Sequence, residues 1–344
     1  MEMDHFMDEY MRSCTLCPRS CKVDRLSGAR GVCGVPADVY VARAALHFWE
    51  EPCISGANGS GAVFFTGCGL KCAYCQNAPI SGTGAKTARE PDGGPDDLHL
   101  PGILGRRVTV EHLSEIFLRL QNEEGANNIN LVTAAQYIPQ VAAALKLAKE
   151  SGLTIPVVYN SSGYEKVESL RLLDGLVDVY LPDFKYMDIE LARKYSHAAD
   201  YPEAAKAAIG EMVRQAGSLE FYDEPAQPKK AGSKYPPGGR LIRKGVIVRH
   251  MLLPGHVKNA RAVVKYLHET YGSDIYISMM NQYTPMGTSA GDDKDMELLA
   301  RKVTKREYER LVDYAVEIGV GNGFVQEGGT AKESFIPSWN GEGV

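Results

Sequence analysis

The chain lacks several features that would exclude an ordinary globular enzyme. It has no run of about 18 uninterrupted apolar residues, which a membrane-spanning helix requires. It has no excess of basic residues, since its formal net charge is −5, so a general nucleic-acid-binding surface is not expected. The first residues, MEMDHFMDEYMRS, are acidic and contain no basic stretch followed by an apolar core, so no secretory signal is visible. These absences predict a cytoplasmic protein that binds neither membranes nor nucleic acids.

Cysteine is present, and its distribution is uneven. Three of the eight cysteines lie close together at Cys68, Cys72 and Cys75, and Cys53 stands alone. The other four form an earlier group at Cys14, Cys17, Cys21 and Cys33. In a reducing cytosol, closely spaced cysteines are more often metal ligands than disulfides. Two metal sites are therefore expected, with Cys53 as a small buried hydrophobic residue.

From residue 61 onward, strand-like and helix-like patterns alternate. The predicted strands are 61–67, 128–133, 154–160, 177–185, 241–255, 274–282 and 323–327. The predicted helices are 110–121, 139–152, 164–173, 257–271 and 305–320, with two more within 188–217. This order indicates parallel β/α units with right-handed crossovers. About six units fit, so the expected fold is α/β, a partial (βα)6 TIM-type barrel whose functional residues lie at the carboxyl ends of its strands.

Three regions are expected along the chain. Residues 1–59 contain no long periodic pattern and are predicted to form a small cysteine-rich, metal-binding lobe. Residues 60–330 would form the partial barrel, and residues 331–344 a C-terminal tail. Two segments, 82–107 and 223–240, are rich in Gly, Pro and charged residues and indicate surface insertions.

The segment GCGLKCAYCQN places Cys68, Cys72 and Cys75 in a C-x3-C-x2-C pattern directly after the first predicted strand. A cubane cluster has four irons, so three thiolates leave one iron without a protein ligand. An open coordination position allows a metal site to bind and activate a small molecule. The alternatives are a zinc site or buried cysteines without a ligand. Zinc prefers four ligands, and no fourth candidate lies nearby in sequence.

This motif resembles that of the radical S-adenosylmethionine (SAM) superfamily, which also has an aromatic residue, here Tyr74, before its last cysteine. The chain further resembles the group similar to the pyruvate formate-lyase activating enzyme. The resemblance covers nearly the whole chain, in CTLCPRSCKVDR, HFWEEPCISGANGSGAVFFTGCGLKCAYCQN, NINLVT, VVYNSSGYE, LPDFKY, VRHMLLPGH, ISMMNQYTP and NGFVQEGGTAKESFIP.

The resemblance implies a reaction and its cofactors. A reduced [4Fe–4S] cluster would cleave SAM, and the 5′-deoxyadenosyl radical would remove a hydrogen atom from a substrate, as in activases of glycyl-radical enzymes. A reductant such as flavodoxin or ferredoxin would supply the electron, and the unknown substrate would be a protein or peptide. Two alternatives remain: a radical SAM enzyme acting on another peptide or small molecule, and a non-catalytic iron–sulfur electron carrier or scaffold.

The resemblance also indicates residues around SAM. The superfamily's Gly-Gly-Glu motif is replaced here by Thr133-Ala134-Ala135-Gln136, so Thr133 or Gln136 would bind the amino group unless Gln136 faces solvent. Polar residues at two strand ends would contact the ribose and the methionine group of SAM. These residues are Asn160, Ser161, Ser162, Asp183 and Lys185. The alternatives are helix capping by the serines and a surface salt bridge between Asp183 and Lys185.

The remaining candidates lie further along the same strand ends. Arg249 and His250 should point to opposite faces of their strand, so at most one faces the barrel, and His250 or His256 is expected to contact SAM. Among weaker candidates, Asn281 and Gln282 would hydrogen-bond substrate or adenine, or else only order their loop, and Gln326 with Glu327 would close the pocket on the substrate side. A solvated loop is the preferred interpretation for His47, Glu50 and Glu51.

The first cysteine group has C-x2-C-x3-C spacing, with the fourth cysteine eleven residues beyond the third. Four thiolates without a nearby histidine suit a structural zinc ion and an auxiliary iron–sulfur cluster equally well. A bound metal would explain how a short segment with little core stays ordered.

Overall fold

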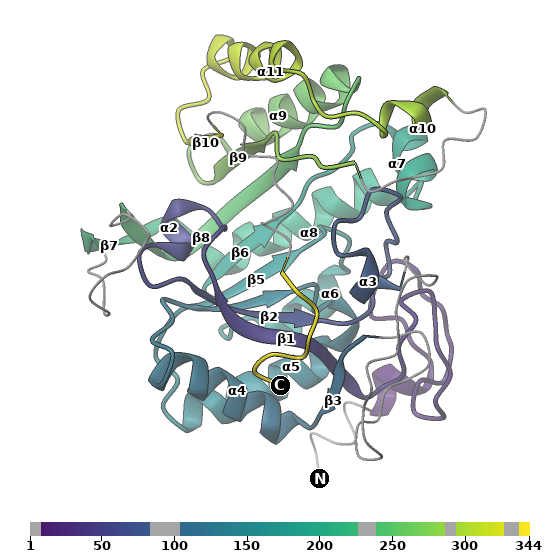
Figure 1. The fold of residues 1–344 in the computed structure, drawn as a ribbon, viewed down its shortest axis with the longest axis vertical. Coiled ribbons are helices and arrows are strands. Elements are labelled where there is room, and N and C mark those ends of the chain that lie inside the picture. The colour runs from purple at the N-terminus through teal and green to yellow at the C-terminus, as the bar shows by residue number, and fades with distance from the viewer. Residues whose placement is uncertain (1–7, 83–103, 226–238, 286–293, 327–336) are drawn as a thin grey trace.

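A computed structural model describes residues 8–82, 104–225, 239–285, 294–326 and 337–344. These residues form a mixed α/β structure around one large sheet (Figure 1). Neighbouring parallel strands make up most of the sheet, in the spatial order β2 (Ser60–Phe65), β4 (Ile129–Val132), β5 (Val157–Ser161), β6 (Val179–Pro182), β8 (Arg240–Met251), β9 (Tyr276–Met280) and β10 (Gly323–Val325).

Three further strands pair antiparallel at the margins of this array. They are β1 (Val39–His47) beside β2, β3 (Arg106–Val108) beside β1, and β7 (Glu220–Pro225) beside β8. The sequence prediction placed all of residues 1–59 in a separate lobe without a long regular element. That prediction is wrong for β1, which belongs to the main sheet. Its residues are apolar on both faces, so β1 shows no alternation that would mark it as a strand.

Helices connect the parallel strands. The longer ones are α4 (Val110–Asn122), α5 (Ile138–Glu150), α7 (Ile189–Ser196), α8 (Tyr201–Ala216), α9 (Val257–Tyr271) and α11 (Lys305–Glu317). The short ones are α2 (Pro52–Ser55), α3 (Ala78–Ser81), α6 (Val167–Leu170) and α10 (Lys294–Leu298), with 3-10 turns η1 (Ala135–Tyr137) and η2 (Arg171–Leu173). In Figure 1, α4 and α5 lie side by side at one end of the molecule and α9 and α11 at the other.

Side-chain caps fix where several helices begin. The Thr109 side chain accepts a hydrogen bond from the His112 amide at the start of α4, and Asp188 accepts from two amides at the start of α7. Thr304 and Glu307 form a capping box at the start of α11. These caps satisfy amide groups that have no partner within the helix, so each helix starts at a defined residue.

The main core lies between the sheet and its helices. All residues of β2, β4, β5 and β6 are buried, as expected for parallel strands covered on both faces. The predicted α/β class is confirmed, and every predicted strand and helix from residue 110 onward is present, mostly with shorter bounds. Residues 164–173 are the exception, because only α6 and η2 form there. Strands β3 and β7 lie partly within segments predicted to be loops.

The described C-terminal residues, 337–344, lie along β1 and α4 (Figure 1). The Ala44 amide donates to Glu342 O at 2.9 Å, and Arg119 Nη2 donates to Gly343 O at 2.7 Å. The Trp339 ring contacts Phe64 edge-on, at 5.2 Å between centroids. This part of the predicted tail is therefore packed against the sheet. Across the described residues, no helix has the length and apolar character needed to cross a membrane.

Candidate functional site

The loop after β2 brings three cysteines to the edge of the sheet. Cys68, Cys72 and Cys75 line one cavity of about 230 Å³, which we call the three-cysteine cavity. Gly67 begins the loop with a φ of 89°, and a Cβ there would lie 2.7 Å from Val35 Cγ1, so this position requires glycine. The β2 strand and its glycine thus deliver all three thiols to the carboxyl end of the sheet.

Hydrogen bonds to sulfur are already present in this loop. The Leu70 amide donates to Cys68 Sγ at 3.4 Å, and Ser196 Oγ donates to Cys72 Sγ at 3.0 Å. Burial raises the pKa of Cys72 to about 12, with Lys185 opposing the rise and Cys68 adding to it. A bound metal would reverse this cost, because thiolates bind metal in the deprotonated form.

The three thiols are the donors that this cavity offers to a metal centre. No group of three or more His, Cys, Asp or Glu side chains in the described parts of the chain is arranged to hold a single metal ion. The three thiols line a shared cavity, and four-iron clusters are bound by thiolates spread around a core of several atoms. A [4Fe–4S] cluster with three protein ligands would use donors of this type and number.

The predicted strand-end residues line the same three-cysteine cavity. Asn160 and Ser161 end β5 and Ser162 follows it, and Asp183 with Lys185 follows β6. Gly163 has a φ of 73°, and a Cβ there would lie 2.2 Å from Asp183 O, so only glycine allows these two loops to approach so closely.

Arg249 connects these residues into a buried charge network that the sequence did not reveal. Its Nη1 donates to Glu50 Oε2 at 2.9 Å, its Nε to Asp183 Oδ1 at 3.2 Å, and its Nη2 to Asn160 Oδ1 at 2.6 Å. Lys185 Nζ donates to the other oxygen of Asp183 at 2.6 Å. Two carboxylates and two cations therefore balance one another at the floor of the cavity.

The charges of this network shift its pKa values. Burial disfavours the charged form of Asp183, but Lys185 and Arg249 outweigh burial and lower its pKa. Burial likewise opposes the charge on Lys185, yet Asp183 outweighs it and raises the pKa. Glu50 is only 8% exposed, so the prediction of a solvated loop is wrong for this residue. Asp183 and Lys185 therefore stay ionised near neutral pH and present both signs of charge to a ligand.

The walls of the cavity are partly apolar. Phe64, Met251 and Met280 line it, together with His47, whose pKa burial lowers to about 4. His47 is thus neutral near pH 7. Glu51 is also buried, and burial raises its pKa, so it too lies outside any solvated loop.

Tyr74 lines the cavity, and its hydroxyl accepts a hydrogen bond from Tyr186 at 2.6 Å. Tyr186 in turn shares a hydrogen bond of 2.8 Å with Ser196, the residue that donates to Cys72. Sequence reasoning missed Tyr186 and Ser196, because neither lies in the cysteine motif nor at a strand end.

Thr133 and Gln136 take different positions. Thr133 lines the three-cysteine cavity with a φ of 60°, a left-handed conformation that is costly for a β-branched residue. Gln136 does not line this cavity and does not face solvent. Its Nε2 donates to the Thr66 and Gly67 carbonyls, both at 3.0 Å, behind the cysteine loop. The structure thus supports Thr133, and not Gln136, as a residue that a ligand could reach.

His250 does not line the cavity, contrary to the sequence prediction. Its Nδ1 lies 2.7 Å from Phe184 O, its side chain is 1% exposed, and burial lowers its pKa to about 4. The inward residue of this strand is Arg249. His256 does not line the cavity either, and its Nε2 lies 2.8 Å from the Tyr195 hydroxyl.

Of the weaker candidates at the last strands, one lines the cavity and two others support its loop. Gln282 lines the cavity, and its Oε1 accepts from Gln326 Nε2 at 3.2 Å. Gln326 Oε1 accepts from the Asn281 amide at 2.8 Å, so Asn281 and Gln326 hold the Gln282 loop. Glu327 lies outside the described residues.

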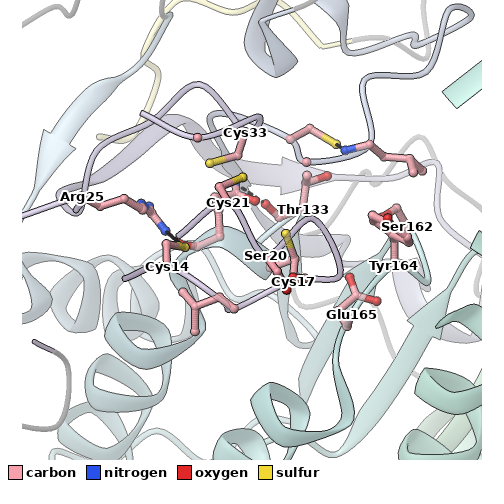
Figure 2. A pocket seen from close by; sticks show the side chains of 17 residues that line it. Cys14, Cys17, Ser20, Cys21, Arg25, Cys33, Thr133, Ser162, Tyr164 and Glu165 are labelled. Carbon is pink, nitrogen blue, oxygen red and sulfur yellow. Dashed lines mark hydrogen bonds between the residues drawn. The ribbon is translucent and has the colours of Figure 1, made fainter. Parts of the chain in front are cut away.

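The N-terminal cysteines surround a second, smaller cavity of about 30 Å³, the four-cysteine cavity (Figure 2). All four of Cys14, Cys17, Cys21 and Cys33 line it. It shares Cys68, Leu70, Thr133 and Ser162 with the three-cysteine cavity, so the two lie back to back. Glu165 also lines it, and burial raises the pKa of this carboxyl to about 8. Cys53 lies in neither cavity and packs in an apolar cluster, which confirms its interpretation as a buried hydrophobic residue.

Comparison with known proteins adds little about function. No protein-family model matches the chain. An uncharacterized protein of Methanocaldococcus jannaschii is similar, with 24% identity over 305 residues that span 88% of this chain and 74% of that protein. A crystal structure of the monooxygenase RslO1 from Streptomyces bottropensis matches 65% of this chain and 88% of that one, at 12% identity and a TM-score of 0.23. That likeness is too weak to support a statement about this chain.

Proposed function

We propose that this chain is a radical SAM enzyme, in which Cys68, Cys72 and Cys75 hold a [4Fe–4S] cluster with one iron open to SAM. The observation that carries the proposal is the convergence of these thiols and the strand-end polar residues on one cavity of about 230 Å³. A non-catalytic electron carrier would need the thiols but no adjoining polar cavity. When bound, the reduced cluster and SAM supply a 5′-deoxyadenosyl radical that removes a hydrogen atom from the substrate.

The chain's own residues would bind and orient SAM. Lys185 offers an ammonium group to the carboxylate of SAM, and Asp183 offers a carboxylate to its amino group or hydroxyls. The hydroxyls and amide of Asn160, Ser161 and Ser162 suit the ribose. Arg249 and Glu50 fix these groups in place, because each is held by several hydrogen bonds. Such pre-organisation lowers the entropic cost of binding a flexible ligand.

The apolar wall would exclude water from the reacting atoms. Phe64, Met251 and Met280 face the cavity and offer no hydrogen-bonding group of comparable strength to water. Exclusion of water protects a reactive intermediate from side reactions. The substrate would enter on this side, next to His47 and the half-exposed Trp49.

The proposed function also includes the fold, the electron donor and the substrate class that the sequence predicts. The parallel strands from β2 to β10 would form a partial TIM-type barrel, with the cysteine-rich residues before β1 as a small additional unit. A flavodoxin or ferredoxin would donate the electron in the cytoplasm. The substrate would be a protein or peptide, as for activases of glycyl-radical enzymes.

The test is release of 5′-deoxyadenosine. Anaerobically reconstituted protein, reduced with dithionite and given SAM, should release it, while Cys72→Ala should lower release below detection. Cys53→Ala removes a cysteine outside both cavities and should release as much as the unmodified chain. Absence of release from cluster-loaded protein, with and without candidate substrates, would contradict the proposal and favour an electron carrier. A glycine-centred radical in an added glycyl-radical protein, seen by electron paramagnetic resonance, would identify the activase reaction.

A further inference from the structure

The four-cysteine cavity is built by an unusual loop. The Cys14 amide donates to Val23 O at 3.0 Å, and the Lys22 amide donates back to Cys14 O at 2.9 Å, so the chain closes on itself around Cys17 and Cys21. Ser20 and Lys22 adopt φ values of 42° and 54°, which are costly for residues other than glycine. Strain of this kind persists only where the surroundings impose it, often at a binding site.

The fourth cysteine approaches from a separate segment. Gly31 lies against Cys21, and a Cβ there would be 2.8 Å from Cys21 Sγ. The neighbouring Val32 amide lies 3.4 Å from the same sulfur and donates to it. Segment 31–33 thus brings Cys33 to the cavity and an amide donor to the sulfur of Cys21, as the ligand sulfurs of metal centres often have.

Arg25 gives independent evidence about the charge of an occupant. It is only 1% exposed, and its guanidinium donates to Pro36 O at 2.6 Å and to Gln136 O at 2.7 Å. It also donates toward Cys14 Sγ at 3.8 Å (Figure 2). Within the described residues these partners are carbonyl oxygens and sulfur, with no carboxylate among them. A buried cation needs a compensating anion, because burial of an unpaired charge is costly. Metal-bound thiolates of the adjoining cysteines would supply that anion.

From these observations we infer that Cys14, Cys17, Cys21 and Cys33 hold a second iron–sulfur cluster, fully ligated by protein, with Arg25 balancing its negative charge. The inference goes beyond the proposed function and does not depend on SAM cleavage.

The arrangement of the thiols favours a cluster over a zinc ion. Four thiolates that bind one Zn²⁺ all lie about 2.3 Å from it. Among the described residues, no three of these thiols form a group that could hold a single metal ion. A four-iron cluster spreads its thiolates around several atoms, so it suits this arrangement better.

The second cluster would lie next to the first. A Cβ at Gly69, within the three-cysteine loop, would be 3.4 Å from Cys17 Sγ. Arg19 Nε also donates to Gly69 O at 2.8 Å, so the two cysteine segments are in direct contact. Because the two sites are adjacent, the iron content of the unmodified chain does not show which site holds it. The iron must therefore be counted in variants that lack the cysteines of one site.

The test uses a chain in which Cys68, Cys72 and Cys75 are all replaced by Ala. After anaerobic reconstitution with iron and sulfide, this variant should keep about four irons and four sulfides per chain, against about eight of each in the unmodified protein. After reduction, this variant should also show the electron paramagnetic resonance signal of a reduced iron–sulfur cluster. Zinc without sulfide, or no metal in the folded variant, would overturn the inference. If this variant does not fold, about eight irons in the unmodified protein supports the inference and about four overturns it.

Two further comparisons identify the site and the role of Arg25. Replacing the four N-terminal cysteines by Ala should remove about half of the iron, whereas Cys53→Ala should remove none. Arg25→Gln should shift the midpoint potential of the cluster in the triple variant to a more negative value, and Arg25→Lys should shift it less. Equal potentials in all three would contradict the charge-balancing role. A failure to cleave SAM would leave the iron count of the triple variant unchanged, so the two proposals fail separately.

Discussion

The two cysteine cavities differ in how their buried positive charges are balanced. In the four-cysteine cavity, Arg25 contacts carbonyl oxygens and the sulfur of Cys14. In the three-cysteine cavity, Lys185 and Arg249 are paired with the carboxylates of Asp183 and Glu50. The first cavity therefore suits the anionic cluster that we propose, whereas the second is balanced by its own side chains and can accept a ligand that carries both charges.

The cavities also differ in size and in the number of thiols. The four-cysteine cavity is about 30 Å³ and the three-cysteine cavity about 230 Å³. Four thiolates around a small space can satisfy a metal centre completely, while three beside a larger polar space leave one position for another molecule. The four-cysteine site would therefore hold a closed metal centre, whereas the three-cysteine site would bind another molecule at its metal centre and react with it.

The largest expected effect comes from removing the cation of the balanced cavity. Arg249→Met leaves the carboxylate of Glu50 buried without its cation and leaves Asp183 with Lys185 alone, so the free energy of unfolding should fall by about 3–5 kcal/mol. Denaturant unfolding of the metal-free chain at pH 7 measures it. Arg193→Met, which removes an exposed ion pair with Glu190 on α7, is the matched control and should cost far less. Similar losses in both variants would show that the network is not buried in solution.

A second test asks whether His250 belongs to the core behind this cavity. Its pKa falls from an ordinary 6.5 to about 4 in the folded chain, because the buried ring resists protonation. The stability that this provides is fully present above pH 6.5 and is lost as the pH falls toward 4, in total about 3 kcal/mol. As the pH falls from 6.5 to 4, the free energy of unfolding of His250→Asn should therefore decrease by about 3 kcal/mol less than that of the unmodified chain.

The measurement is denaturant unfolding at pH values from 4 to 7. His112→Asn replaces a half-exposed histidine on α4 and should give a pH profile parallel to that of the unmodified chain. A parallel profile for His250→Asn as well would contradict the burial of His250 in the core behind the cavity.

A smaller effect is expected at Lys185. Lys185→Met removes one charged donor while Arg249 still holds Asp183, so affinity of the cluster-loaded protein for SAM should fall about 10- to 100-fold. Equilibrium dialysis measures the dissociation constant. Lys185→Arg keeps the charge and should lose less, and Lys206→Met, on α8 and outside the cavity, should lose nothing. Unchanged affinity in Lys185→Met would remove this residue from the SAM site.

The α/β class and one edge of the site could be predicted from the sequence. Parallel strands all end at the same edge, so Asn160, Ser161, Asp183 and Lys185 could be grouped from their positions alone. Glu50 could not, because it follows β1, whose apolar residues on both faces hide the strand. The choice between Arg249 and His250 also could not be made, since alternation only sets them on opposite faces. The pairing of Arg249 with Asp183 across neighbouring strands decides it.

The most direct test of the central claim is whether SAM touches the cluster held by Cys68, Cys72 and Cys75. Electron–nuclear double resonance of the reduced protein with SAM labelled by nitrogen-15 at its amino group reports contact between that nitrogen and iron. The account predicts a strong coupling, which persists when Cys14, Cys17, Cys21 and Cys33 are replaced by Ala. A reduced cluster at these three cysteines that shows no coupling to the labelled nitrogen would contradict it.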